Sequence, residues 1–323
     1  MGKLSLSLIV LVVCLAGSAA PQQAWAQSPK TAADYNNRGL DRQAKGDLDG
    51  AIDDYTKALG LKPSGPTVAI IYNNRANARM AKNDLDGAIA DYGKASEVER
   101  DNPEHYYNRG IARLTKGENE GAAADFSKVI ELSPRFVVAY NHRGNARRAT
   151  GDVEGAIADY TKAVEQNPRY AEAFYNRGAA RQAKNDFDGA IEDYSKAIEL
   201  APQFSDALVN RGLAKQGKKD FASAIADLTE ALKLKPDDAG TYFARATARH
   251  EANQLDAAVG DYSKVIALDP SNAQAFANRA VIQMLRGKKV EAERDFAEAF
   301  RLDASLKPQY IRFIEGQRTK PKN

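Results

Sequence analysis

Large and small side chains recur along the chain with a period of 34 residues. Units of this length bury their apolar faces against one another, so the period is the first indication of the fold. Each unit has a large side chain at its positions 4 and 24, Gly or Ala at position 8 and Ala at position 20. Small residues at these places let two helices approach closely where they cross. The pattern therefore predicts a pair of packed helices in each unit.

Eight such repeats fill most of the chain, and glycine, aspartate and proline mark their turns. In the first repeat Gly46 is expected to cap the first helix in a left-handed conformation, and Asp47 to cap the second. Proline at position 32 ends the second helix in most repeats. The predicted repeats are residues 32–65, 69–102, 103–136, 137–170, 171–204, 205–238, 239–272 and 273–306. A short capping helix is expected over residues 307–316 and a basic tail over residues 317–323.

These positions carry a family resemblance. The unit resembles the tetratricopeptide repeat (TPR), which has an aromatic residue at positions 4 and 24, small residues at 8, 20 and 27, and proline at 32. The resemblance implies an all-α fold, a right-handed α-solenoid of tandem helical hairpins. In this family the first helices line a concave groove that holds peptides or partner proteins. The family's clamp for C-terminal carboxylates is not matched, because only an Asn such as Asn74 fits its pattern.

The chain departs from the family pattern at several positions. Position 7, usually Leu, is Arg in all eight repeats. Position 11, usually Tyr, is Arg in six repeats, Lys215 in the sixth repeat and Gln283 in the eighth. Repeats two and eight have Arg100 and Ala304 where proline is expected.

The arginine at position 7 is matched by an aspartate at position 23 in every repeat. The two positions lie equally far before and after the turn, so antiparallel helices bring them to the same level, where guanidinium and carboxylate form a planar fork. We interpret the pairs as structural; the alternative, an arginine ladder for acidic ligands, requires the aspartates to point elsewhere. The expected pairs are Arg38–Asp54, Arg75–Asp91, Arg109–Asp125, Arg143–Asp159, Arg177–Asp193, Arg211–Asp227, Arg245–Asp261 and Arg279–Asp295.

Position 6, which faces the groove in the family, is rich in asparagine. It is occupied by Asn37, Asn74, Asn108, His142, Asn176, Asn210, Ala244 and Asn278. A carboxamide both donates and accepts, so a row of them could pair with the backbone of an extended peptide, although the same residues could also be merely solvated. Neighbouring groove positions are mixed, with polar residues such as Arg148 beside aromatic ones. Tyr107 and Tyr175 could anchor a ligand or could simply pack.

The amino terminus predicts export. Lys3 precedes an apolar run over residues 4–16, and Ala24-Trp25-Ala26 offers a small-x-small cleavage site. We expect cleavage after Ala26 of a signal peptide over residues 1–26 and a periplasmic or secreted mature chain, with retention as an anchor the alternative. No later apolar stretch is long enough for a membrane span.

Charge and chemistry leave binding as the expected role. With 46 basic and 43 acidic residues the net charge is +3. This charge is too small to create the positive electrostatic field that nucleic-acid binding requires. The three histidines fall in separate repeats, so no catalytic residue, metal site or cofactor is expected. The resulting hypothesis is an exported, non-enzymatic scaffold that binds an extended peptide or partner protein in its groove. The alternative is a regulatory or substrate-presenting subunit of a cell-envelope enzyme complex, with contacts on the convex face or end caps. The oligomeric state stays open.

Overall fold

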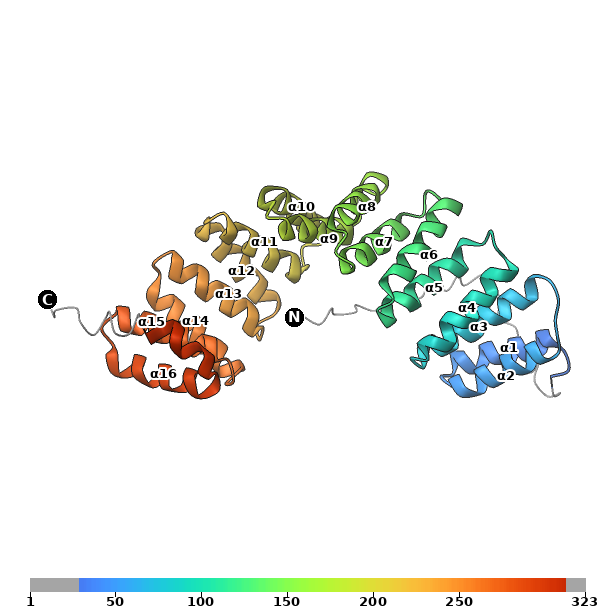
Figure 1. Ribbon diagram of the computed structural model, residues 1–323, viewed down its shortest axis with the longest axis horizontal. Helices are drawn as coiled ribbons and strands as arrows, with labels where there is room; N and C mark the ends of the chain where they lie inside the picture. Colours follow the sequence, from blue (N-terminus) through green and yellow to red (C-terminus); the bar gives the residue numbers. More distant parts are fainter. Residues whose placement is uncertain (1–28, 312–323) are drawn as a thin grey trace. The chain divides into compact units, whose positions relative to one another are not determined.

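The structure, a computed structural model, describes residues 29–311, which contain α-helices and no strand (Figure 1). The helices are α1 (Ala32–Ala44), α2 (Leu48–Gly60), α3 (Pro66–Ala81), α4 (Leu85–Val98), α5 (Pro103–Lys116), α6 (Asn119–Leu132), α7 (Val137–Ala149), α8 (Val153–Gln166), α9 (Ala171–Ala183), α10 (Phe187–Leu200), α11 (Ser205–Gly217), α12 (Phe221–Leu234), α13 (Ala239–Glu251), α14 (Leu255–Leu268), α15 (Ala273–Leu285), α16 (Lys289–Leu302) and the short 3-10 helix η1 (Ala304–Leu306). Each odd-numbered helix packs against the even-numbered helix that follows it. The predicted all-α array of tandem hairpins is therefore confirmed. We call the odd-numbered helices the first helices of repeats 1 to 8 and the even-numbered ones the second helices.

The chain divides after Arg100 into two compact blocks. The N-terminal block contains repeats 1 and 2, and the C-terminal block contains repeats 3 to 8. The division follows the repeat that has Arg100 in place of proline and Gly93 at position 25, where most repeats have Ser or Thr. Each block is described separately below.

The turn inside each hairpin follows the chemistry of its residues. Gly46 has a φ of 83°, and the Asp47 side chain accepts a hydrogen bond from the Gly50 amide as the N-cap of α2. The same cap is formed by Asp84, Asp152, Asp186 and Asp220. An N-cap of this kind stabilises a helix by about 1 kcal/mol. Asp47, Asp84 and Asp186 each open an Asp-x-Asp-Gly sequence, and all three sequences begin helices.

The core is shared between neighbouring repeats. In the N-terminal block, Ala51 and Tyr55 of α2 form one buried cluster with Ile71 and Ala78 of α3. In the C-terminal block, a cluster of the same kind joins α13, α14 and α15 around Tyr262. A single hairpin does not bury its apolar face alone, so each repeat depends on the next.

Small residues at position 8 allow this packing. A methyl group added at Gly144 would lie 2.6 Å from the Cε1 atom of Tyr160, the buried ring at position 24 of the same repeat. Atoms at that distance overlap, so the ring and the glycine backbone fill the crossing point between α7 and α8.

The last repeat is closed by the segment that follows it. Residues 307–311 are helical, and Tyr310 packs its ring 5.7 Å from that of Phe296 in α16. This segment occupies the first half of the capping helix predicted over residues 307–316. The remainder of that helix, the tail over residues 317–323 and the signal peptide over residues 1–26 lie outside the described residues.

Candidate functional site

Position 7 and position 23 meet in every repeat as a two-pronged ion pair. In repeat 5, the Arg177 Nη2 atom lies 2.6 Å from Asp193 Oδ1, and Arg177 Nε donates to the same carboxylate. The equivalent pairs are Arg38–Asp54, Arg75–Asp91, Arg109–Asp125, Arg143–Asp159, Arg211–Asp227, Arg245–Asp261 and Arg279–Asp295. All eight aspartates are buried. The pairs join the two helices of each hairpin.

A second cation, at position 11, completes each of these sites except the last. Arg181 Nη1 lies 2.9 Å from Asp193 Oδ2 and also donates to the carbonyl of Gly189 at the start of α10. The equivalent cations are Arg42, Arg79, Arg113, Arg147, Lys215 and Arg249. Burial raises the pKa of Asp193, whereas the hydrogen bond of Arg177 and the charges of Arg177 and Arg181 oppose the rise. Sequence reasoning noted the basic residue at position 11 but gave it no partner.

The position-7 arginines also connect consecutive repeats. Arg177 Nη1 donates to the hydroxyl of Thr161, at position 25 of the preceding repeat, over 3.2 Å. Arg75, Arg143, Arg211, Arg245 and Arg279 make the same bond. The aspartates point at the arginines, so the condition for a free arginine ladder is not met.

Three asparagines of position 6, Asn74, Asn176 and Asn210, lie between successive first helices and form hydrogen bonds there. Asn74 Nδ2 donates to Asn36 Oδ1 over 2.9 Å, and Asn176 Nδ2 donates to Asn141 Oδ1 over 3.0 Å. Asn210 donates to the Tyr175 hydroxyl. In each case position 6 of one repeat meets position 5 of the repeat before it. We call these contacts the 5–6 rungs.

The remaining asparagines of this row lie in different environments. Asn278 donates to the Tyr262 hydroxyl and accepts from Tyr310 of the closing segment. Asn37 is exposed and Asn108 is half-buried. Within residues 29–311, no hydrogen bond reaches the Oδ1 atoms of Asn74 and Asn210, and neither oxygen is among the buried unpaired atoms. These two oxygens are therefore accessible acceptors.

His142 and the two tyrosines of the first helices take part in ring packing. The His142 ring stacks on Phe126 with a centroid separation of 5.5 Å, and burial lowers its pKa to about 4. Tyr107 packs 5.1 Å from Phe136, and burial raises its pKa to about 12. Tyr175 packs 4.7 Å from Phe204. In the C-terminal block, Tyr107, His142 and Tyr175 thus lie on first helices with their rings packed against neighbouring rings.

A pocket of about 520 Å³ opens on the first helices between α11 and α13. It lies where position 5 is Val209 and position 6 is Ala244, so no polar 5–6 rung forms there. Its lining is Val209, Leu213, Gln216, Asp238, Gly240, Thr241, Phe243, Ala244 and Thr247. Sequence reasoning recognised Ala244 as an interruption of the asparagine row but did not predict an apolar hollow.

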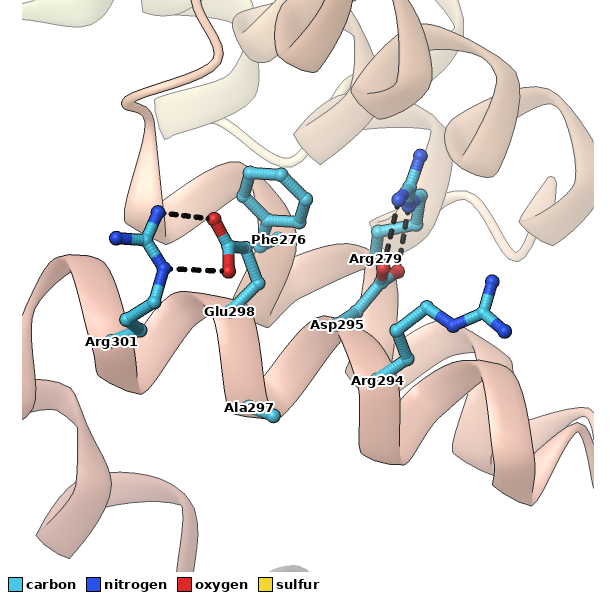
Figure 2. Close-up of a pocket in the computed structure, with 7 residues that line it drawn as sticks. All are labelled: Phe276, Arg279, Arg294, Asp295, Ala297, Glu298 and Arg301. Carbon is cyan, nitrogen blue, oxygen red and sulfur yellow. Dashed lines mark hydrogen bonds and ion pairs between the residues drawn. The ribbon is translucent and has the colours of Figure 1, made fainter.

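A second pocket, of about 490 Å³, lies in the last repeat between α15 and α16. Figure 2 shows its charged lining: Arg279 pairs with Asp295, Arg301 pairs with Glu298, and Arg294 reaches away from both pairs. In this repeat the position-11 cation is replaced by Gln283 and the hydroxyl of position 25 by Ala297.

Two further features of the described residues concern metal binding and membrane spans. His105, His142 and His250 lie on the separate helices α5, α7 and α13, and within residues 29–311 no group of three His, Cys, Asp or Glu side chains is placed to bind a metal ion. In the same range no helix combines the length and the apolar character that crossing a membrane requires.

Comparisons with family models identify the repeat. Models described as TPR repeat or tetratricopeptide repeat match residues 76–117, 144–185 and 246–287, residues 171–204, and residues 104–136 and 205–238. Together they cover more than half of the chain. No curated protein matches it.

Several solved structures share the fold. The MamA protein is 28% identical, with 54% of this chain and 94% of that chain covered and a TM-score of 0.50. YrrB, described as a TPR protein with an unusual peptide-binding site, is 22% identical, with coverage of 61% and 99% and a TM-score of 0.54. The C-terminal part of a TPR repeat-containing protein from Cytophaga hutchinsonii is 20% identical, with coverage of 76% and 98% and a TM-score of 0.62. The TPR fold implies protein–protein interaction, and its members are typically non-enzymatic binding scaffolds.

Removing one buried carboxylate should destabilise its whole repeat. Asp193→Ala leaves Arg177 and Arg181 without their shared partner, and we expect the free energy of unfolding to fall by about 3–5 kcal/mol. Chemical denaturation followed by circular dichroism measures this. Asp188→Ala is the matched control on α10, because Asp188 pairs with Lys218 in an exposed position and its loss should change stability by less than about 0.5 kcal/mol. Equal effects of the two substitutions would contradict the structural role of the buried cluster.

His142 predicts a loss of stability in acid. Its pKa of about 4 in the folded chain lies below the unperturbed 6.5, so the unfolded chain takes up the proton first as the pH falls. Between pH 7 and 4.5, wild-type protein should lose about 2 kcal/mol more stability than His142→Phe, which keeps the ring packing without the titration. Parallel urea denaturation of both proteins across this pH range tests the difference, and identical pH profiles would show that His142 is not held neutral by burial.

Proposed function

The chain belongs to the tetratricopeptide repeat family, and from this premise we propose that it is an exported, non-enzymatic scaffold. It binds an extended segment of a partner protein on the face formed by its first helices. The observation that carries the proposal is the pocket between α11 and α13, because it places an apolar hollow on the face where 5–6 rungs link α7 to α9 and α9 to α11. Val209, Leu213 and Phe243 supply its apolar lining.

The asparagines of position 6 give this face a polar component. In Asn74 of the N-terminal block and in Asn210 of the C-terminal block the amide nitrogen is engaged between helices, so the group left for a ligand in each block is the carboxamide oxygen. An oxygen of this kind accepts a hydrogen bond from a backbone N–H whatever the side chain of the ligand. Each such bond contributes about 1 kcal/mol. Loose recognition of a backbone, with specificity from the neighbouring pocket, follows from this arrangement.

Export is proposed on the sequence of residues 1–26, with Lys3, the apolar run and the Ala24-Trp25-Ala26 site. The partner would then be another protein of the cell envelope or a secreted protein. Expression of the full chain in a Gram-negative host, followed by amino-terminal sequencing of the soluble periplasmic fraction, tests this. The mature chain should begin at Gln27; an uncleaved chain in the cytoplasm would contradict export, and an uncleaved chain in the membrane would favour a retained anchor.

A second candidate function is a subunit that contacts its partner through its end or its second helices. The charged pocket between α15 and α16 favours it, because Arg294 and Arg301 are exposed on α16, the second helix of the last repeat. This surface suits a polar protein interface.

The two candidates predict opposite results in one experiment. Leu213→Glu places a charge in the pocket on α11, and Ala226→Glu places the same charge on an exposed position of α12 in the same repeat. Each purified mature variant is immobilised, and the proteins captured from an envelope extract are compared with those captured by wild type. We expect Leu213→Glu to lose most of the specifically captured protein and Ala226→Glu to retain it, with similar thermal melting of both variants. The reverse result would favour contact through the second helices, and full retention by both would contradict binding on the first helices of repeats 6 and 7.

A further inference from the structure

Two neighbouring arginines at the end of α7, Arg147 and Arg148, lie in different environments. Arg147 donates to the buried Asp159 and so belongs to the ion-pair cluster of repeat 4. Arg148, one residue later, is turned by about 100° around the helix axis. Within residues 29–311 Arg148 forms no ion pair. It is a half-buried cation whose hydrogen-bond partner is the Tyr160 side chain and not a carboxylate.

Tyr160, Tyr175 and Tyr194, on three further helices, lie within electrostatic range of Arg148, and the carboxylates of Glu172 and Asp206 also act on Tyr160 and Tyr175, respectively. Burial raises the pKa values of Tyr160, Tyr175 and Tyr194, on α8, α9 and α10, and the charge of Arg148 opposes the rise in each case. Tyr160 and Tyr194 donate their protons to Asn145 and Gln182, respectively.

Tyr175 differs from the other two tyrosines because its oxygen accepts from Asn210. Its own proton is therefore left to donate. The guanidinium of Arg148 and the hydroxyl of Tyr175 are both donors, and a carboxylate is the group that two such donors hold best.

The first helices of the C-terminal block connect this cation to the apolar pocket. Helix α7 contacts α9, α9 contacts α11, and α11 contacts α13. Tyr175, Val209 and Phe243 occupy the same position 5 in three successive repeats, so they lie on one face. At about 10 Å per helix, the junction of α7 and α9 lies about 20 Å from the junction of α11 and α13, which is the length of about six residues of extended chain.

We propose that this face of the C-terminal block recognises an extended peptide that carries an acidic side chain at Arg148 and an apolar side chain in the pocket between α11 and α13. The inference rests on the proposed function and adds the chemistry of the partner to it. The occupant is assigned from charge complementarity, since Arg148 forms no ion pair within residues 29–311, and from the apolar lining of Val209, Leu213 and Phe243. Arg148 occupies position 12 of its repeat, the position from which Gln216 lines the pocket two repeats later. The spacing between the two side chains is about six residues.

The direct test uses fluorescein-labelled peptides with a Gly-Ser host sequence, one Glu and one Phe. The separation of the two residues is varied from about two to about ten positions in both orders, and binding to the mature chain is measured by fluorescence anisotropy. Affinity should be highest near a separation of six and should fall about tenfold when Glu is replaced by Gln in the peptide.

Variants of the protein assign the two contacts. Arg148→Gln should bind the Glu and Gln peptides equally, and Arg148→Lys should keep a preference for Glu. Arg135→Gln removes the same charge from an exposed turn residue and should behave as wild type. Ala244→Phe fills the pocket and should weaken binding of both peptides about tenfold while leaving the preference for Glu unchanged. Thermal melting of each variant confirms that it is folded.

The outcomes separate this inference from the proposed function. A Glu preference that survives Arg148→Gln, or affinity that does not depend on separation, would overturn the inference. If envelope-protein capture still depends on Leu213 in that case, the proposed function stands and only the chemistry assigned to the partner is wrong. If no peptide binds and Leu213→Glu captures the same proteins as wild type, both the inference and the proposed function are wrong.

Discussion

The buried aspartate at position 23 is the constraint on which each repeat depends. A carboxylate with almost no exposed surface is costly unless charged donors surround it, and here cations from positions 7 and 11 of the facing helix do so in seven repeats. The site fixes the register of the two helices, because the planar fork of Arg177 meets Asp193 in only one alignment. The same guanidinium then reaches Thr161 of the preceding repeat, so one side chain sets both the hairpin and its stacking.

A second set of polar contacts, the 5–6 rungs, links α1 to α3 in the N-terminal block and α7 to α9 and α9 to α11 in the C-terminal block. Asn176 and Asn141 are both buried, and their bond satisfies polar groups that would otherwise be stranded between α7 and α9. These amides serve the structure with their nitrogens, and the accessible oxygens of Asn74 and Asn210 are what remains for a ligand. The carboxamide nitrogen therefore has the structural role, and the carboxamide oxygen is the atom available for binding.

The sequence predicted the features that follow from periodicity and missed those that depend on the neighbours of a single residue. The spacing of Arg177 and Asp193 around the turn was sufficient to predict their pairing, since antiparallel helices leave one level at which they meet. The partner of Arg181 was not predicted, because a basic residue four positions further along the helix is equally compatible with a solvated face. The Asn176–Asn141 bond depends on how α9 sits against α7, and the period of 34 residues carries no information on that geometry. The apolar pocket was missed for the same reason. The sequence shows only that Ala244 replaces an asparagine at position 6, and the pocket beside it depends on how α11 and α13 pack.

An ideal repeat array would present the same environment in every repeat, and a ligand would then have no reason to prefer one place over the next. Specificity in this chain must therefore come from residues that break the period. Arg148 stands where other repeats have Gln43, Met80 or Leu114, and it brings a charge that forms no ion pair in the described chain. Val209 and Ala244 replace a polar rung with a pocket two helices further along. The periodic residues hold the helices in place, and the two departures give the surface a charge and a hollow at a fixed separation, which are the properties a binding face needs to select one partner.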